Sequence, residues 1–160
     1  MRVGVLSDTH LRDGSLLAGS VFEALSGVEM IVHAGDIVSL SVIEALETLA
    51  PVYAVRGNMD RFEEMKALPE RRVVSAGGKK IGLIHGWGAP LGLEERVRKR
   101  FDAAGVSAIV YGHTHIPTIK QADSVLLFNP GSATGRLPAP CASVGILHIG
   151  ADLAGEIVRL

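Results

Sequence analysis

Cysteine, aromatic residues and excess charge of either sign are all scarce in this 160-residue sequence. The single cysteine, Cys141, cannot form an internal disulfide, so a disulfide-stapled secreted scaffold is excluded. The 16 Lys and Arg residues nearly balance the 17 Asp and Glu residues, which leaves a net charge of −1. Electrostatic binding to nucleic acid or a membrane needs an excess of positive charge, which this sequence lacks. Stacking on nucleic-acid bases needs aromatic side chains, and only 4% of the residues are aromatic. We therefore expect neither nucleic acid nor a membrane as a partner.

Long hydrophobic runs are also missing. No stretch approaches the roughly 20 apolar residues that a membrane-spanning helix requires. The N-terminal segment MRVGVLSDTH reaches polar residues by position 8, which is too early for the apolar core of a signal peptide. We therefore expect a cytoplasmic protein, and 48% apolar residues predict one domain, 1–160, with a substantial core. The mean hydropathy of +0.31 fits a homodimer or homotetramer, but a large internal core explains it equally well.

Apolar runs alternate with amphipathic segments in the first half of the chain. Three such runs predict buried strands: 2–6, 30–33 and 52–55. Helical spacing from Leu16 to Leu25 predicts a helix that ends at Gly27. Ser41 and Glu44, spaced as a capping box, predict the start of a second helix. Its apolar face would consist of Val42, Ile43, Leu46 and Leu49. This alternation indicates a parallel sheet with right-handed crossovers.

The second half of the chain has mostly antiparallel character. Gly77-Gly78 separates two strand-like segments and predicts a tight hairpin. Helical spacing over 93–104 predicts one more helix, with Gly105 beyond its end. The predicted strands are 72–75, 80–84, 108–111, 118–121, 125–128, 143–149 and 156–160. Together the two halves predict an α/β fold in which two mixed β-sheets pack face to face with helices outside, a four-layer α-β-β-α sandwich.

Side chains that can bind metal ions occur where the predicted strands end. In parallel α/β sheets, functional sites form in the crevice beyond the carboxyl ends of the strands. Five segments stop on such a residue, usually beside a glycine that allows close approach of two backbones. They are Asp8-Thr9-His10, Gly35-Asp36, Gly57-Asn58, His85-Gly86 and Gly112-His113-Thr114-His115.

The two pairs with a spacing of two residues have simpler explanations when taken alone. Asp8 and His10 can project the same way from an extended stretch, as one cation would require, but a turn capped by Asp8 is more common. His113 and His115 share this spacing, although loop histidines are often only solvated.

The other three candidates are also unremarkable singly: Asp36 as a cap, Asn58 as a turn residue and His85 as a satisfied, partly buried histidine. Taken together, seven candidate ligands are too many for one tetrahedral ion. They suit two ions about 3.5–4 Å apart with one bridging carboxylate. Imidazole, carboxylate and amide donors favour Mn²⁺, Fe²⁺, Co²⁺, Ni²⁺ or Zn²⁺, and without a thiolate a structural cysteine-type zinc site is excluded.

This series of motifs resembles the calcineurin-like metallophosphoesterase superfamily. Within the superfamily, the chain is similar to the small YfcE-like phosphodiesterase branch of bacteria and archaea, and to the eukaryotic retromer subunit with the same fold. The resemblance extends from Leu6 to the Asn-Pro-Gly-Ser segment at 129–132. The family fold, two mixed sheets between helices, agrees with the predicted elements.

The resemblance implies a role for each candidate ligand. The metal ligands would be Asp8, His10 and His115 for the first ion, Asn58, His85 and His113 for the second, and Asp36 as the bridge. Mn²⁺ is the favoured metal. The implied reaction is in-line attack on a small phosphoester by a hydroxide that bridges the two ions, with Asp36, Asn58 and His113 as catalytic residues.

Two positions depart from the family pattern. Met59 stands where many members have a histidine that assists the leaving group, although the small phosphodiesterases commonly lack it and keep the aspartate that matches Asp60. Because Met59 cannot donate a proton, we expect poor activity on esters with basic leaving groups. Trp87 stands where the branch often has a second histidine. It could stack on a base or an aryl ester, or simply pack at the rim of the cleft.

Several other charged or polar residues have expected roles near the site. We expect His33, inside a strand, and Asp60 to support the ligands without binding metal. Arg56 could orient phosphate or pair with a carboxylate such as Asp60. Arg136 lies in a Gly/Pro-rich loop and is a candidate for contact with substrate phosphate. The basic run at 96–100 indicates a solvated helix face, because basic residues favour the C-terminal half of a helix.

Two classes of function follow from these patterns. The leading hypothesis is a metal-dependent phosphodiesterase that acts on a small phosphoester. The alternative is a scaffold that keeps the metallophosphoesterase fold and binds other proteins with little or no catalysis. Retention of all seven candidate ligands favours the enzyme, whereas the missing acid at Met59 favours the scaffold.

Overall fold

The computed structural model describes residues 1–160, in which ten strands form two five-stranded sheets. The first sheet has the order β10-β9-β1-β2-β3. Its strands are β1 (Arg2–Leu6), β2 (Met30–His33), β3 (Val52–Ala54), β9 (Ser143–Ile149) and β10 (Leu153–Arg159). The second sheet has the order β4-β5-β6-β8-β7. Its strands are β4 (Arg71–Ala76), β5 (Lys79–Ile84), β6 (Ala108–Val110), β7 (Thr118–Ala122) and β8 (Val125–Asn129).

Both sheets are mixed, as predicted. In the first sheet β1, β2 and β3 are parallel, β9 lies antiparallel beside β1, and β10 lies antiparallel beside β9 at the edge. The second half of the chain is less antiparallel than its sequence indicates. Strands β5, β6 and β8 are parallel to one another, and only β4 and β7, at the two edges, are antiparallel. A helical crossover joins β5 to β6, and such a connection produces parallel neighbours.

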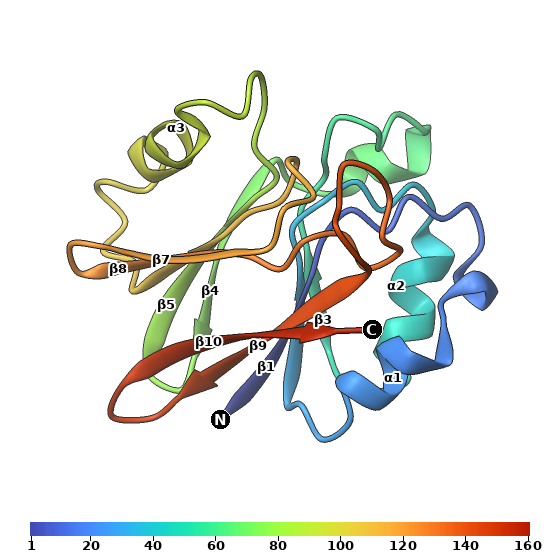
Figure 1. Ribbon diagram of the computed structural model, residues 1–160, viewed down its shortest axis with the longest axis horizontal. Coiled ribbons are helices and arrows are strands. Elements are labelled where there is room, and N and C mark those ends of the chain that lie inside the picture. Colours follow the sequence, from blue (N-terminus) through green and yellow to red (C-terminus); the bar gives the residue numbers. More distant parts are fainter.

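Three α-helices cover the outer faces of the two sheets. Figure 1 shows α1 (Gly19–Ala24) and α2 (Leu40–Glu47) on one side of the molecule, with α3 (Leu93–Lys99) on the other. Strand alternation explains the layers, because Val3 and Val5 point into the core between the sheets while Leu6 packs with the helices. A smaller apolar cluster joins α3 to the outer face of the second sheet. The predicted four-layer arrangement is therefore confirmed.

The N-terminal boundaries of the first two helices differ from the predictions. Leu16 belongs to a 3₁₀ turn, Gly14–Leu16, and is 64% exposed, so α1 begins only at Gly19. The N-cap of α2 is Ser39, whose hydroxyl accepts a hydrogen bond from the Ser41 backbone N–H. The predicted capping box at Ser41 is therefore wrong, because that hydroxyl accepts the backbone N–H of Gly14 instead.

The C-terminal ends of α2 and α3 also differ from the predictions, and the structure contains one further element. Leu49 lies beyond the end of α2 and is 37% exposed, so it is not part of the buried face. Helix α3 ends at Lys99 and gives way to turns over 100–104. A second 3₁₀ helix, Glu63–Ala67, has no counterpart among the predicted elements. None of the three α-helices is long and apolar enough to cross a membrane.

Candidate metal centre

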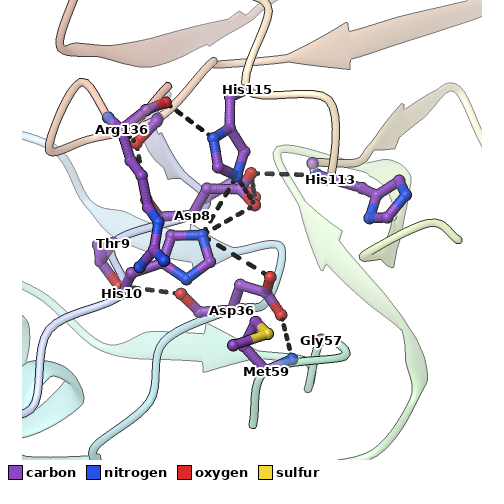
Figure 2. Close-up of polar contacts among 12 residues, drawn as sticks. Asp8, Thr9, His10, Asp36, Gly57, Met59, His113, His115 and Arg136 are labelled. Carbon is purple, nitrogen blue, oxygen red and sulfur yellow. Dashed lines mark hydrogen bonds and ion pairs between the residues drawn. The ribbon is translucent and has the colours of Figure 1, made fainter. Parts of the chain in front are cut away.

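The segments that follow five parallel strands supply the predicted ligands. Asp8 and His10 follow β1, Asp36 follows β2 and Asn58 follows β3. His85 follows β5, while His113 and His115 follow β6. The carboxyl ends of strands from both sheets meet at one edge, where Figure 2 shows Asp8, His10, Asp36 and His115 turned toward one another. Residues 107 positions apart in the chain are thus brought into one cluster.

Each carboxylate has one oxygen held by protein donors. Asp8 Oδ2 accepts hydrogen bonds from the Ser7 hydroxyl at 2.6 Å and from the His113 backbone N–H at 3.1 Å. Asp36 Oδ1 accepts the Met59 backbone N–H at 2.7 Å. The second oxygens, Asp8 Oδ1 and Asp36 Oδ2, are therefore left to face the histidines.

The open carboxylate oxygens lie close to imidazole nitrogens. Asp8 Oδ1 is 3.2 Å from His115 Nε2 and 3.7 Å from His10 Nε2. Asp36 Oδ2 is 3.3 Å from His85 Nε2 and 3.7 Å from His10 Nε2. The nearly complete burial of both carboxylates removes the water that would otherwise solvate this arrangement.

Backbone carbonyls fix the orientation of two of these histidines. His85 Nδ1 lies 2.8 Å from the Ala34 carbonyl, and His115 Nδ1 lies 2.8 Å from the Arg136 carbonyl. A carbonyl only accepts hydrogen bonds, so each Nδ1 carries a proton, and in the neutral ring Nε2 presents a lone pair. That lone pair points at a carboxylate oxygen. Asp8 Oδ1 and His85 Nε2 are both buried without a hydrogen-bond partner. A cation between these two atoms would satisfy both. A histidine whose other ring nitrogen donates to a backbone carbonyl is typical of metal sites.

Asn58 and His113 form a similar arrangement beside His85. His113 Nε2 is 2.8 Å from the Gly88 carbonyl, so it is the nitrogen that donates. In the neutral ring His113 Nδ1 is then an acceptor, and it lies 3.2 Å from Asn58 Oδ1, which is also an acceptor. The rings of His85 and His113 meet edge to face with centroids 5.5 Å apart. These atoms fit a second cation.

Two groups of three side chains have ligand atoms close enough to hold one ion each. One comprises Asp8, His10 and His115, and the other comprises Asp8, Asp36 and His85, with all ligand atoms of a group within 4.8 Å of one another. Five of the seven predicted ligands therefore fall in these groups, and Asn58 and His113 adjoin the second. Asp8 is common to both, whereas the family resemblance implies that Asp36 is the bridge. The Asp36 Oδ2 atom also lies between His10 and His85.

The backbone at the ligands is strained. Only seven non-glycine residues have positive φ, and five of them are predicted ligands: Asp8, His10, Asp36, His113 and His115. Left-handed backbone costs free energy in residues with a side chain and is concentrated at functional sites. The sequence pattern does not predict these positive φ angles. They occur in short loops that turn sharply at the end of a strand.

Mutual pairing shifts the pKa values of the carboxylates and histidines. Burial raises the pKa of Asp8 and Asp36, but the attraction of the nearby His115 and His85 rings, together with the hydrogen bonds from Ser7 to Asp8 and from Met59 to Asp36, outweighs it, so both values fall below the usual one. The pKa of His115 is raised, chiefly because its protonated ring can donate a hydrogen bond to Asp8 Oδ1, 3.2 Å away. Burial lowers the pKa of His85, but interactions with the two carboxylates raise it overall. Protons thus compete for the places that metal ions would take.

Asp60 and His33 hold the loops that carry the ligands. Asp60 accepts the backbone N–H groups of Ile37 and Val38 with one oxygen, at 2.8 and 2.6 Å, and that of Gly57 with the other at 2.7 Å. Burial raises the pKa of Asp60, and this effect outweighs the hydrogen bonds, which lower it. His33 is completely buried beside Thr9, and burial lowers its pKa to about 3. Neither belongs to the two groups of ligands.

The predicted substrate contacts lie at different places around the centre. Arg56 pairs with Glu70 at 2.8 Å, so its carboxylate partner is not Asp60. Trp87 is 37% exposed. Arg136 is exposed, and Figure 2 shows its side chain extending beside His10. Burial is the main cause of the lowered His10 pKa, and the positive charge of Arg136 contributes to it.

The basic segment at the end of α3 is not simply a solvated face, which corrects that expectation. The Arg96 guanidinium donates to the carbonyls of Leu91 at 2.8 Å, Trp87 at 2.9 Å and Ala89. Arg96 therefore holds the loop in which Gly88 contacts His113. The Arg100 guanidinium lies over the Trp87 ring, 4.9 Å from its centroid. No sequence signal identifies the partners of these two arginines, because the loop that they contact is fixed only in the folded chain.

Comparisons with known proteins identify the family of the chain. A model of the calcineurin-like phosphoesterase superfamily domain matches residues 1–152. The chain is 42% identical over 162 residues to a probable metallophosphoesterase of Methanothermobacter thermautotrophicus, covering 99% of this chain and 92% of the relative. It is 30% identical over 170 residues to a phosphodiesterase of Methanocaldococcus jannaschii, covering 99% of each. Vps29 of Entamoeba histolytica, solved in complex with Zn²⁺, matches with a TM-score of 0.79 at 26% identity, covering 99% of both chains.

The fold and this set of side chains define a metallophosphoesterase. Within that class, the chain belongs to the calcineurin-like phosphoesterase superfamily, as its motifs indicate.

Proposed function

We propose that the protein is a phosphodiesterase that uses two divalent metal ions to hydrolyse a small phosphoester. The observation that carries the proposal is the set of opposed acceptors. Asp8 Oδ1 is buried without a donor, and His85 Nε2 presents a lone pair toward Asp36. Asn58 Oδ1 and His113 Nδ1 face each other in the same way. With neutral rings these contacts are unfavourable, and a proton or a metal ion between the two acceptors makes them favourable.

The ligand assignment proposed here follows the family pattern. The first ion would be held by Asp8, His10 and His115 and the second by Asn58, His85 and His113, with Asp36 shared by both. Mn²⁺ suits this mixture of imidazole, carboxylate and amide donors, as do Fe²⁺, Co²⁺, Ni²⁺ and Zn²⁺. When bound, two such ions lower the pKa of a water molecule toward neutrality and neutralise phosphate charge, which permits in-line attack on phosphorus.

The residues of the chain supply orientation and charge. The carbonyls of Ala34 and Arg136 fix the rings of His85 and His115, so that the ligand nitrogens need no rearrangement. The exposed Arg136 side chain places a positive charge beside His10, where it can contact a substrate phosphate. Met59 contributes only its backbone N–H to Asp36, and its side chain cannot protonate a leaving group. Esters with acidic leaving groups, such as aryl phosphodiesters, should therefore react best.

A direct test is hydrolysis of bis(p-nitrophenyl) phosphate by the purified protein with Mn²⁺. We expect turnover that is lost with EDTA and restored by added Mn²⁺. We also expect a higher kcat/KM for this diester than for p-nitrophenyl phosphate, the matched monoester with the same leaving group. The absence of turnover with Mn²⁺, Co²⁺, Ni²⁺ and Zn²⁺ in turn, measured on folded protein, would refute the proposal.

A protein-binding scaffold is the second candidate, and exposed apolar side chains near the site favour it. Leu91 and Leu137, on loops beside the candidate ligands, are 91% and 84% exposed. The similarity to Vps29 shows that the fold is not confined to proteins named as phosphodiesterases. A chain that binds metal ions but hydrolyses no phosphoester would support the scaffold over the enzyme.

A further inference from the structure

A cleft adjoins the candidate metal centre on the side of Asn58 and His85. Its volume is about 530 Å³, and its walls include Arg56, Arg71 and Arg100 together with Trp87. Pockets that bind small molecules typically have volumes of about 300–1,000 Å³. A phosphate group at the metal centre would leave most of this space free. The cleft is therefore large enough for a further part of a substrate.

The cleft remains positively charged after the ion pair within its wall is taken into account. Glu70 is the only acidic residue in its wall, and it pairs with Arg56 at 2.8 Å. Arg56 also donates to the Lys66 carbonyl at 3.2 Å, so its guanidinium is largely occupied. Neither Arg71 nor Arg100 forms an ion pair with a carboxylate. Two cationic side chains are thus left for a ligand in a chain whose overall net charge is −1.

These two arginines are also held in position. Arg71 Nη1 donates to the Arg100 backbone carbonyl at 2.8 Å, which ties the start of β4 to the end of α3. The Arg100 guanidinium stacks over Trp87 at 4.9 Å from the ring centroid. Side chains restrained in this way lose less conformational entropy when they bind an anion.

We propose that this cleft binds one arm of a phosphodiester substrate, and that this arm carries a second anionic group, a phosphate or a carboxylate, recognised by Arg71 and Arg100. The inference rests on the proposed function and narrows its substrate class. Guanidinium groups bind both anions through paired hydrogen bonds, so the two sources share one chemistry. Trp87 would act as the platform that orients Arg100.

Three p-nitrophenyl phosphodiesters that differ only in the second arm can test this inference. The second arm is derived from ethanol, from 2-hydroxyethyl phosphate or from 4-hydroxybutyrate, and hydrolysis of either ester bond is followed by ³¹P NMR with Mn²⁺ present. We expect kcat/KM for at least one anionic ester to exceed that of the ethyl ester by about tenfold or more. Whichever anionic ester reacts faster identifies the group that is recognised.

Variants separate recognition by the cleft from general attraction to the metal ions. In Arg71→Gln and Arg100→Gln, the ratio of kcat/KM for the anionic and ethyl esters should fall toward one. Arg72→Gln is the matched control, because Arg72 is the next residue on β4, lies outside the cleft and stacks on Tyr53. It should keep the ratio of the unmodified protein. Equal rates for the three esters, or a ratio unchanged in both variants, would overturn the inference and leave the phosphodiesterase intact. If no ester is hydrolysed, the proposed function fails as well.

Discussion

Replacing Asp36 by asparagine is expected to reduce kcat/KM for bis(p-nitrophenyl) phosphate by more than about 100-fold, because partners one step removed from metal ligands already cost about 10–100-fold. Asparagine keeps the oxygen that accepts the Met59 N–H and tolerates the φ of 54° at this position. The substitution therefore removes mainly the negative charge between His10 and His85. Steady-state kinetics at saturating Mn²⁺ would measure the loss.

Asp102→Asn is the matched control for this variant. Asp102 is exposed in the turn after α3 and takes no part in the centre, so its neutralisation should leave kcat/KM within about twofold. Circular dichroism should show both variants folded. Turnover by folded Asp36→Asn at the rate of the unmodified protein would contradict a shared role of Asp36 in metal binding.

A methyl group at Gly112 should disrupt the centre as strongly as the loss of a ligand. A Cβ atom there would lie 1.8 Å from Ser7 Oγ and 2.6 Å from Asp8 Oδ2. The backbone cannot easily retreat, because the Gly112 N–H donates to the His85 carbonyl at 3.0 Å and its carbonyl accepts from Asn129 at 3.1 Å. We expect Gly112→Ala to displace Asp8 and abolish Mn²⁺-dependent turnover. Overpacking of this kind typically costs about 1–3 kcal/mol of stability.

Gly19→Ala distinguishes this steric effect from a general effect of replacing glycine. A Cβ atom at Gly19 meets nothing within 4 Å, and alanine is favourable in a helix. This control should keep full activity and equal or higher stability in urea denaturation. If Gly112→Ala were as stable and active as Gly19→Ala, the close approach of the two loops would not be required for the centre.

The convergence of the ligands could be predicted because it follows from strand geometry. Parallel strands share the edge at which they end, so polar residues after β1, β2 and β3 must lie near one another. The motifs after β5 and β6 join them because the two sheets pack face to face, an arrangement predicted from the two halves of the chain taken together. The fold and the seven candidate ligands therefore follow from local patterns and from the family resemblance.

Features that depend on distant partners could not be predicted. The true N-cap of α2 is Ser39, because the Ser41 hydroxyl is engaged by Gly14, 27 residues away. The basic end of α3 has the composition of a solvated face, yet Arg100 stacks on Trp87 and Arg96 binds the preceding loop. A charged residue on a short helix gives no sign of which loop will pack beside it. For the same reason, the cleft beside the metal centre could not be predicted, because its walls come from segments that are far apart in the sequence.

Metal stoichiometry tests the central claim most directly. Equilibrium dialysis of the metal-free protein against Mn²⁺ at pH 7.5, followed by elemental analysis, should give two ions per chain. His113→Ala should give one, because His113 lies with Asn58 beside the second group of ligands and outside the first. A value of zero or one for the folded, unmodified protein at saturating Mn²⁺ would contradict a two-metal centre.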